Sequence, residues 1–378
     1  MNQCVFNSSD RGRSAAPLRS AQRTTFSDPL VLELGGQLPS VTVTYETYGT
    51  LNATRDNAVL VCHAISGDSH VARHDDHDAL GWWDILVGPG RPIVISFSSD
   101  WLFPPEQSRQ IVDALIAANR PVTYCNVDAS GGHDSFLLEE KLSIHGGLIQ
   151  AFTAQVDDTG PARAPDQSVP RAQLIKPTNI FHGHRLDYDI VLPLIPPAAS
   201  VLDLGCGDGV LLSHLRERGH RDLVGVELDE ESLLACVDQG LDVVQHNLEQ
   251  GLSPFAAGQF DVVVLSQTLQ SIMDTEGIVE EMLRVGHSCI VSFPNFAYHK
   301  LRKMLCEEGR SPKAGGVCQF DWYNTPHRRF PSIADVEEFC ARKAIRVQQK
   351  LYLDSETRRR ITDAPNRNAD MAIFVLRS

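Results

Sequence analysis

The sequence predicts an α/β protein whose C-terminal half holds a mostly parallel, doubly wound sheet, preceded by an incomplete α/β segment. From residue 175 onward, runs of β-branched residues alternate with stretches in which leucines recur at helical spacing. Near-continuous β-branched runs are typical of strands that helices bury on both faces. The clearest strand-to-helix turn is 201–209 (VLDLGCGDG), where an apolar run breaks into three glycines. Because ligands of such sheets bind at the carboxyl ends of the strands, this turn is the first candidate site.

The elements of the C-terminal half follow one another in a regular order. Leucines within 211–215 predict a helix after the glycine turn, and Asp229 is placed to cap a second helix that stops at Gly240. A late helix is expected to start near Ser332. The expected strands begin at or span 201, 223–226, 243, 261–265, 289–293 and 372–376.

An N-terminal part richer in strands precedes this half. Residues 41–45 and 58–62 predict short strands. The first 25 residues carry four arginines among many serines but no apolar helical face, which indicates a disordered leader. Residues 155–172 hold several prolines without apolar periodicity, as linkers do. We expect a leader, an N-terminal segment, a linker and a C-terminal domain: 1–25, 26–140, 141–174 and 175–378.

Composition excludes several classes of partner. A net charge of −14 over 378 residues disfavours nucleic acid, and the basic triplets 327–329 and 358–360 are short and isolated. No apolar run approaches the ~18 residues that a membrane span needs. Nine cysteines without metal-ligand spacing indicate reduced thiols and a cytoplasmic protein. The run 74–78 (HDDHD) is expected to be a solvated acidic loop, so no metal site is predicted.

The glycine turn is expected to hold a nucleotide-like cofactor. Gly205, Gly207 and Gly209 allow positive φ and close approach of a ligand to free backbone N–H groups. Glu227 follows about 20 residues later, at the end of the next strand, where a carboxylate accepts hydrogen bonds from ribose hydroxyls. The spacing G-x-G-x-G after Asp203 resembles motif I of class I S-adenosylmethionine methyltransferases, not the dinucleotide fingerprint. The alternative is a glycine-rich turn that binds nothing.

Two further strand ends bear on this site. The resemblance places Asn247 and Leu248, which follow the third strand, beside the adenine of the cofactor. Ser266 ends the fourth strand, where the methyl group of the sulfonium is presented in such enzymes. Gln267 and Gln270 follow it, and both a role at the site and ordinary loop polarity remain open for them.

Longer motifs give a more specific resemblance. The segments 265–270 (LSQTLQ), 290–296 (IVSFPNF) and 322–326 (WYNTP) closely resemble the MetW family of methionine-biosynthesis proteins, over about 175–378. The resemblance implies a Rossmann-like class I methyltransferase domain that binds S-adenosylmethionine or S-adenosylhomocysteine. It also implies an association with homoserine acylation, without naming a methyl acceptor. Asn247 departs from the acid that many such enzymes carry at this position.

The N-terminal segment resembles a second family. Its motifs are similar to the start and the end of homoserine O-acetyltransferase (MetX), an α/β-hydrolase: 45–52, 62–70, 81–84, 98–107 and 132–137. The resemblance implies that Asp100 and His133 are the acid and the base of a catalytic triad and that the backbone at Ile65 forms part of an oxyanion hole.

The triad lacks its nucleophile. No G-x-S-x-G elbow lies between the oxyanion loop and Asp100, because the sequence passes from the early loop to the final strand across the Ile93–Val94 junction. We therefore expect an acyltransferase remnant, with Ser66, Ser69, Ser98 and Ser99 as poor substitutes.

Three functions remain open from the sequence. The chain is a methyltransferase acting on a small molecule, a non-catalytic partner or regulator of homoserine acylation, or an acyltransferase once its missing segment is supplied. The expected partner is a complete homoserine O-acetyltransferase or a second copy of the chain.

Overall fold

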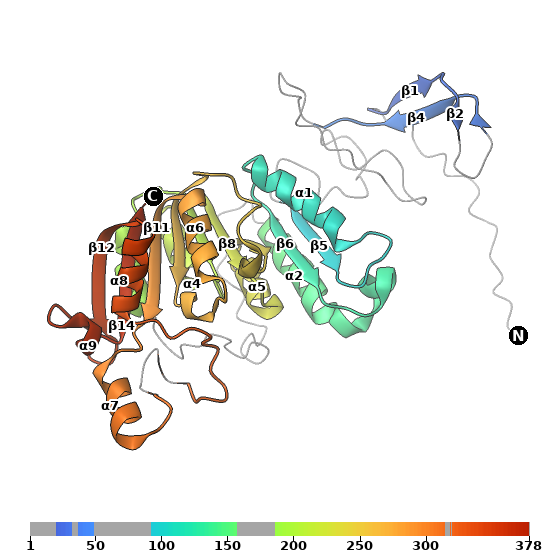
Figure 1. Cartoon of the computed structure of the whole chain (residues 1–378). Helices are drawn as coiled ribbons and strands as arrows, with labels where there is room; N and C mark the ends of the chain where they lie inside the picture. The colour runs from blue at the N-terminus through green and yellow to red at the C-terminus, as the bar shows by residue number, and fades with distance from the viewer. Residues whose placement is uncertain are drawn as a thin grey trace, which may run out of the picture. The chain divides into compact units, whose positions relative to one another are not determined.

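The computed structural model describes residues 20–31, 37–48, 92–156, 186–313, 318 and 320–377. The chain divides into two compact units, Met1–Gly90 and Arg91–Ser378 (Figure 1). Most of the leader and the expected strand 58–62 lie outside the described residues.

The first unit contains two small antiparallel pairs. Strand β1 (Gln22–Phe26) pairs with β4 (Val41–Tyr45), and β2 (Leu30–Val31) pairs with β3 (Gln37–Leu38). Strand β4 is the one predicted at 41–45, whereas β1 occupies residues that were expected to belong to the leader. Most side chains of β1 and β4 are exposed, so this pair has little core of its own.

The second unit is built around one ten-stranded sheet, in the order β13-β12-β14-β11-β10-β7-β8-β9-β6-β5. Neighbours from β11 to β5 run parallel, whereas β14 runs antiparallel to both β11 and β12. The strands are β5 (Ile93–Phe97), β6 (Thr123–Val127), β7 (Val201–Leu204), β8 (Leu223–Glu227), β9 (Asp242–Gln245), β10 (Phe260–Ser266), β11 (Gly286–Pro294), β12 (Arg346–Asp354), β13 (Arg359–Arg360) and β14 (Met371–Arg377). All strands predicted for the C-terminal half are present.

Helices cover both faces of this sheet (Figure 1). One apolar cluster joins alternate strand residues to α2 (Leu142–Val156), α3 (Leu186–Val191), α4 (Val210–Glu217) and α5 (Glu230–Asp238). The other joins the intervening residues to α1 (Pro105–Ala117), α6 (Thr275–Val285) and α8 (Ile333–Arg342). In β10, Val262 and Val264 face the first cluster, while Val263 and Leu265 face the second. Burial on both faces is why the β-branched runs are nearly continuous.

The predicted cap at Asp229 and the predicted start of the late helix are confirmed. Asp229 accepts a hydrogen bond from the Ser232 N–H at 2.8 Å and starts α5. Ser332 starts α8 with a capping box, in which its hydroxyl and the Asp335 carboxylate each bond the other's backbone. Helix α7 (His299–Glu308) lies between β11 and α8, and α9 (Pro365–Asn368) lies between β13 and β14.

The acyltransferase-like strands belong to the same sheet as the C-terminal domain. Strand β6 pairs with β9 through Tyr124 and Val244. The Asn126 N–H donates to Gln245 Oε1 at 2.6 Å, and Arg109 donates to the Gln245 carbonyl at 3.0 Å. Residues 92–156 therefore extend the sheet rather than forming a separate body.

Helix α2 strengthens the junction between residues 92–156 and the C-terminal domain, which we call the seam. Leu148 and Phe152 of α2 are buried in the same cluster as Leu233 of α5. Gly147 allows close packing, since a Cβ there would meet Leu234 at 3.2 Å. Residues 142–156 were expected to be linker, so the structure differs there: a stretch with no clear period packs as a helix because tertiary contacts stabilise it.

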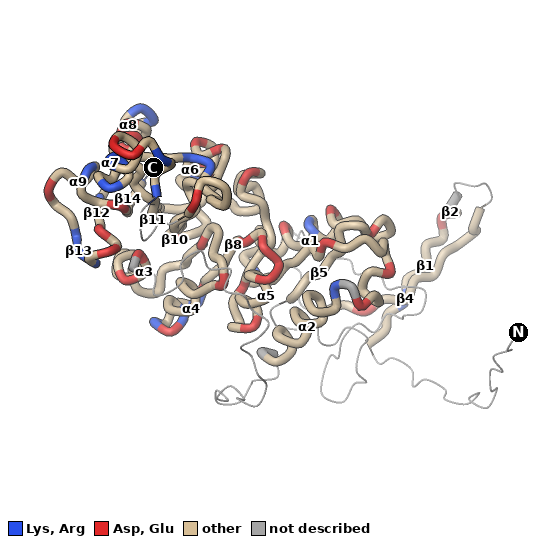
Figure 2. Tube along the Cα trace, turned by 90° about the horizontal axis from the view of Figure 1, so that it is seen from below, with Lys and Arg blue, Asp and Glu red and all other residues tan. Residues whose placement is uncertain are grey.

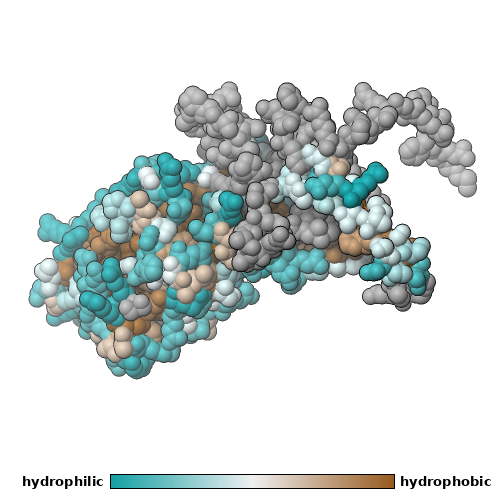
Figure 3. All heavy atoms as spheres, turned by 90° about the horizontal axis from the view of Figure 1, so that it is seen from above, coloured by the Kyte–Doolittle hydropathy of each residue, from teal (hydrophilic) through white to brown (hydrophobic). Residues whose placement is uncertain are grey.

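The surface agrees with the composition. Figure 2 shows Lys and Arg dispersed among acidic residues over the described trace, without a continuous basic track. Figure 3 shows apolar atoms mainly in recesses between hydrophilic side chains. None of the helices in the described ranges is long and apolar enough to cross a membrane.

Candidate functional site

The expected place for a ligand is the point where the strand order reverses. Strand β7 has β8 on one side and β10 on the other. Helix α4, which follows β7, packs on one face of the sheet, and α6, which follows β10, packs on the opposite face. At such a switch point the two connections diverge and leave a crevice at the carboxyl ends of the strands.

The glycine turn lines this crevice. Gly205, Gly207 and Gly209 have φ of 69°, 57° and 78°, in the left-handed region that favours glycine. A Cβ on Gly209 would meet Leu241 at 2.5 Å, and one on Gly205 would meet Thr268 at 2.9 Å, so these two are required by packing. A Cβ on Gly207 would meet nothing within 4 Å. Gly207 therefore faces open space, as a ligand-contacting glycine must.

Glu227 is bound to this turn. One carboxylate oxygen accepts the Gly207 N–H at 2.8 Å, and the other accepts the N–H groups of Leu228 and Asp229 at 2.7 and 3.1 Å. A carboxylate offers about four acceptor positions, so it keeps capacity for a hydroxyl group of a ligand. Leu228, next to Glu227, is 58% exposed and gives this edge of the sheet an apolar side chain that no sequence motif marks.

The other predicted contacts lie at the same edge of the sheet. Asp203 is buried at the end of β7, beneath the turn. Asn247 follows β9 and caps a short 3₁₀ helix, Leu248–Gln250, by accepting the Glu249 N–H at 3.0 Å. That cap uses one of the two lone pairs of its side-chain oxygen, and the amide NH₂ still has both of its donors.

Ser266 is part of a buried network. Its hydroxyl donates to Asp187 and lies 3.1 Å from the Ser292 hydroxyl. Asp187, in α3, is 2% exposed and belongs to no motif, so sequence reasoning missed it. The network connects the ends of β10 and β11 with α3, on the β10 side of the switch point.

The second predicted site keeps its acid and base in contact. His133 Nδ1 lies 3.0 Å from Asp100 Oδ2, although 33 positions separate them in the sequence. Burial opposes ionisation of Asp100, but hydrogen bonds from the Phe103 and Leu102 N–H groups and from His133 lower its pKa overall. The rings of Phe103 and Phe136 flank His133.

The described residues place no nucleophile on this pair. The Ser98 hydroxyl donates to Asp128 at 2.9 Å, and the Ser99 hydroxyl accepts the Gly132 N–H at 2.9 Å, so both hold the loop together. Ser66, Ser69 and Ile65 lie outside the described residues. What remains is a positioned imidazole without an attacking group.

The seam contains a titratable contact of its own. His246 Nε2 lies 2.7 Å from the Gly251 carbonyl, and Nδ1 contacts the Arg109 guanidinium, so the neutral ring donates through Nε2 and accepts through Nδ1. Burial, together with the charge of Arg109, lowers the pKa of His246.

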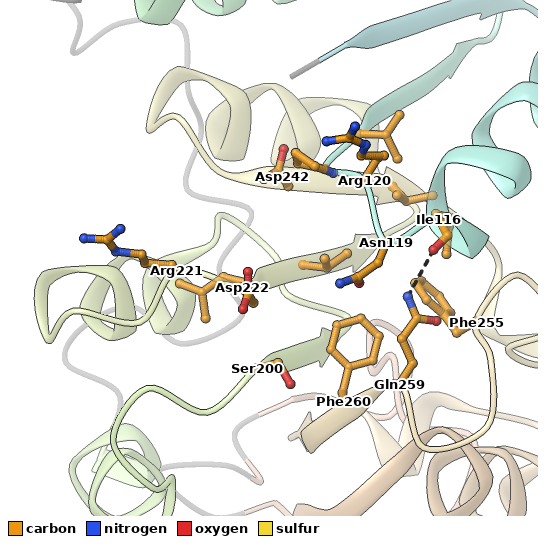
Figure 4. Close-up of a pocket in the computed structure, with 15 residues that line it drawn as sticks. Ile116, Asn119, Arg120, Ser200, Arg221, Asp222, Asp242, Phe255, Gln259 and Phe260 are labelled. Atoms are coloured by element: carbon orange, nitrogen blue, oxygen red, sulfur yellow. Dashed lines mark hydrogen bonds between the residues drawn. The ribbon is translucent and has the colours of Figure 1, made fainter. Parts of the chain in front are cut away.

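A cavity of about 320 Å³ lies at the opposite end of the sheet (Figure 4). Ser200, Asp222 and Phe260, from the starts of β7, β8 and β10, line it. Gln259 donates to the Ile116 carbonyl at 3.2 Å across the seam. Strands β6 and β9 share a single residue pair, which leaves this gap. It faces away from the glycine turn and belongs to no predicted site.

Metal and disulfide chemistry find no support in the part of the chain that the structure describes. No group of three potential metal ligands occurs there, and the acidic run 74–78 falls outside it. The described cysteines are all free; the Cys206 and Cys236 sulfurs lie 3.9 Å apart.

The fold is that of a class I methyltransferase: a doubly wound sheet with an antiparallel strand inserted near one edge, and a left-handed glycine turn followed by an acid after the next strand. Residues 185–376 match the family model described as methionine biosynthesis protein MetW. The chain belongs to this family, and an acyltransferase-like segment is fused in front of the family's domain.

Curated relatives support the fusion. The bifunctional methionine biosynthesis protein MetXA/MetW of Rhodopirellula baltica is 28% identical over 98% of this chain and 95% of its own length. The homoserine O-succinyltransferase of Dechloromonas aromatica is 60% identical over 74 residues, and the homoserine O-acetyltransferase of Methanosphaerula palustris is 45% identical over 92 residues. The chain spans about a fifth of the length of these two acyltransferases.

The alignment with the bifunctional relative also shows how much is missing. It runs over 608 positions and so exceeds the 378 residues of this chain by 230. At least that many positions have no counterpart here, in agreement with a large omission from the acyltransferase part.

Solved structures similar to this chain include an S-adenosylmethionine-dependent methyltransferase from Mesorhizobium loti, with a TM-score of 0.40 and 14% identity, covering 51% of this chain and 98% of that one. A second, from Thermotoga maritima, is described as a possible histamine N-methyltransferase, with a TM-score of 0.37 and 15% identity, covering 50% and 86%.

Proposed function

We propose that the C-terminal domain binds S-adenosylmethionine or S-adenosylhomocysteine at the β7/β10 crevice. The observation that carries the proposal is the Gly207 position, which is left-handed, open to solvent and held by Glu227. In this assignment the glycine turn borders the amino-acid part, Glu227 binds the ribose, and Asn247 and Leu248 lie beside the adenine. Asp203 supports the turn from below, and Ser266 supports the β10 side of the switch point.

The chemistry that the cofactor supplies is an activated sulfonium methyl group. The protein's part in its use is to align a second ligand and exclude water, which needs no general base. Turnover of S-adenosylmethionine distinguishes a methyltransferase from a module that senses the cofactor and supports homoserine acylation.

Calorimetric titration of the full chain with both ligands tests the binding proposal. Glu227→Gln is expected to weaken binding at least tenfold, because hydrogen bonds to a charged group contribute about 1.5–3 kcal/mol. Glu338→Gln, an exposed change on α8, is the matched control and leaves the affinity unchanged. The absence of heat with the native protein at millimolar ligand would refute the proposal.

We also propose that this chain alone does not acylate homoserine. The Asp100–His133 pair is in place, but no hydroxyl group of the described residues reaches it. Acyl transfer from acetyl-CoA or succinyl-CoA to homoserine by the purified protein, abolished by His133→Ala, would overturn this.

A partner that completes the acyltransferase is the companion proposal. Among the described residues β5 is the last strand of the sheet, and the loop after it exposes Trp101 at 74% and Phe103 at 58%. A complete homoserine O-acetyltransferase or a second copy of the chain is proposed to cover this region, in the cytoplasm, where the free thiols of the described cysteines stay reduced. Co-elution in size-exclusion chromatography tests both partners.

A further inference from the structure

The turn after β10 carries two buried acceptor atoms that no described residue satisfies. Gln267 is 6% exposed and Gln270 3% exposed. Among the residues that the structure describes, neither side-chain oxygen has a hydrogen-bond partner. Buried polar atoms are paired in the great majority of cases, so two orphan oxygens in one short turn need a reason.

The surrounding network fixes which way the two amides point. Gln267 Nε2 donates to the Ser292 hydroxyl oxygen at 3.1 Å, and that oxygen also accepts the Gln267 N–H. Gln270 Nε2 donates to the Gln267 carbonyl at 2.6 Å. The Gln267 carbonyl oxygen can only accept. If the Gln270 amide were turned over, its Oε1 would face this oxygen, and neither atom could donate. The Ser292 hydroxyl donates to Asp187 Oδ2 at 3.4 Å, so it has no proton left for a turned-over Gln267 amide, and the free oxygens follow from these contacts.

The backbone is strained at the same place. Gln267 has φ of 54°, a conformation that non-glycine residues adopt rarely and that clusters at ligand sites. The strain lifts this residue out of the strand at the point where β10 ends.

The turn also lies against the cofactor turn. A Cβ on Gly205 would meet Thr268 Oγ1 at 2.9 Å, so the segment between Gln267 and Gln270 directly borders the glycines. These segments follow β7 and β10, the two strands that flank the switch point. A molecule bound beside the cofactor would meet this turn.

We propose that the side-chain oxygens of Gln267 and Gln270 accept hydrogen bonds from an amine or hydroxyl group of the second ligand of this site. The inference rests on the proposed function, because the second ligand is defined as the molecule next to the adenosyl cofactor. It assigns that ligand to a chemical class, compounds that present N–H or O–H donors, and it excludes purely apolar or acceptor-only molecules.

Sinefungin tests the inference without knowledge of the natural ligand. This adenosyl amino acid has an amine-bearing carbon in place of the sulfur, whereas S-adenosylhomocysteine has no donor there. With the native full-length chain, calorimetry is expected to show sinefungin binding about tenfold more tightly, the value of one good hydrogen bond. In the double variant Gln267→Met with Gln270→Met, the ratio is expected to fall to about one, with the affinity for S-adenosylhomocysteine within twofold of native.

Controls separate this outcome from others. Gln349→Met, on the exposed side of β12, keeps the native ratio. If the double variant does not fold, the single change Gln270→Glu replaces it; its carboxylate raises the preference for sinefungin. Equal affinities in the native protein, or a preference kept by the double variant, overturn the inference. If neither compound binds, the proposed function fails first, and this inference fails with it.

Discussion

Two glycines with positive φ, one in the glycine turn and one far from it, allow an effect on ligand binding to be distinguished from an effect on stability. Gly207 and Gly219 have φ of 57° and 91°, and a Cβ on either would meet nothing within 4 Å. Gly207 lies in the turn after β7, whereas Gly219 follows the C-terminus of α4, at the other end of that helix. Alanine at each position must adopt a left-handed conformation, at a cost of roughly 1–2 kcal/mol, with no added clash.

The two variants are expected to differ only in affinity. In Gly207→Ala the new methyl group enters the open space of the crevice, and S-adenosylhomocysteine is expected to bind more than tenfold more weakly. In Gly219→Ala the affinity stays native. Urea unfolding is expected to show a similar loss of about 1–2 kcal/mol in both. Gly209→Ala is expected to lose more, because its Cβ would meet Leu241 at 2.5 Å and Cys236 Sγ at 2.9 Å.

Calorimetry gives the affinity and urea unfolding gives the stability of the same samples, so the two effects are measured separately. Native affinity in Gly207→Ala would show that the open space is not the ligand space. An equal loss of affinity in both variants would show that strain anywhere in the domain, and not contact, weakens binding.

Three further predictions concern the seam. His145→Leu is expected to stabilise the protein by about 1 kcal/mol, measured by urea unfolding, because both ring nitrogens of this buried histidine lack partners in the described structure; a lower midpoint would contradict this. The lowered pKa of His246 predicts that the free energy of unfolding decreases as pH falls below about 6.5, since the unfolded state then binds the extra proton. His246→Asn is expected to flatten this dependence, and an unchanged slope would refute it. A chain shortened to 91–378 is expected to unfold cooperatively. A chain that starts at 175 exposes the edge of β9 and is expected to aggregate. Equal behaviour of the two in light scattering and thermal unfolding would show that the seam is dispensable.

The sequence was sufficient where structure depends on local pattern. The strands from β7 to β11, the cap at Asp229 and the glycine turn all follow from periodicity and residue type, and the structure has them at the expected places. Glu227 was expected at a ligand and lies at the turn, where it also binds the Gly207 N–H. That second role depends on the distance between two strand ends, which spacing alone does not give.

Pairing across the seam could not be predicted in this way. The partner of an edge strand depends on which other edges are free in the folded chain, and β6 meets β9 although about 120 residues separate them. The prolines of 155–172 predict a linker, but residues 142–156 within the predicted range 141–174 form α2, and contacts with α5 supply its stability. Asp187 joins the Ser266 network from a segment without any motif.

The loop after β5 gives the Asp100–His133 pair a structural role that needs no acyl transfer. Asp100 Oδ1 accepts the N–H groups of Leu102 and Phe103, both at 3.0 Å, while Oδ2 holds His133. These bonds close the loop after β5 and connect it to the segment after β6, so they fix the two strands that extend the sheet. Asp100→Ala removes the acceptor of two backbone N–H groups, which water replaces because Leu102 and Phe103 are exposed, and it frees the imidazole, at a cost of about 0.5–1.5 kcal/mol. The pair is therefore accounted for by the stability of residues 92–156, whether or not a partner chain ever supplies a nucleophile to His133.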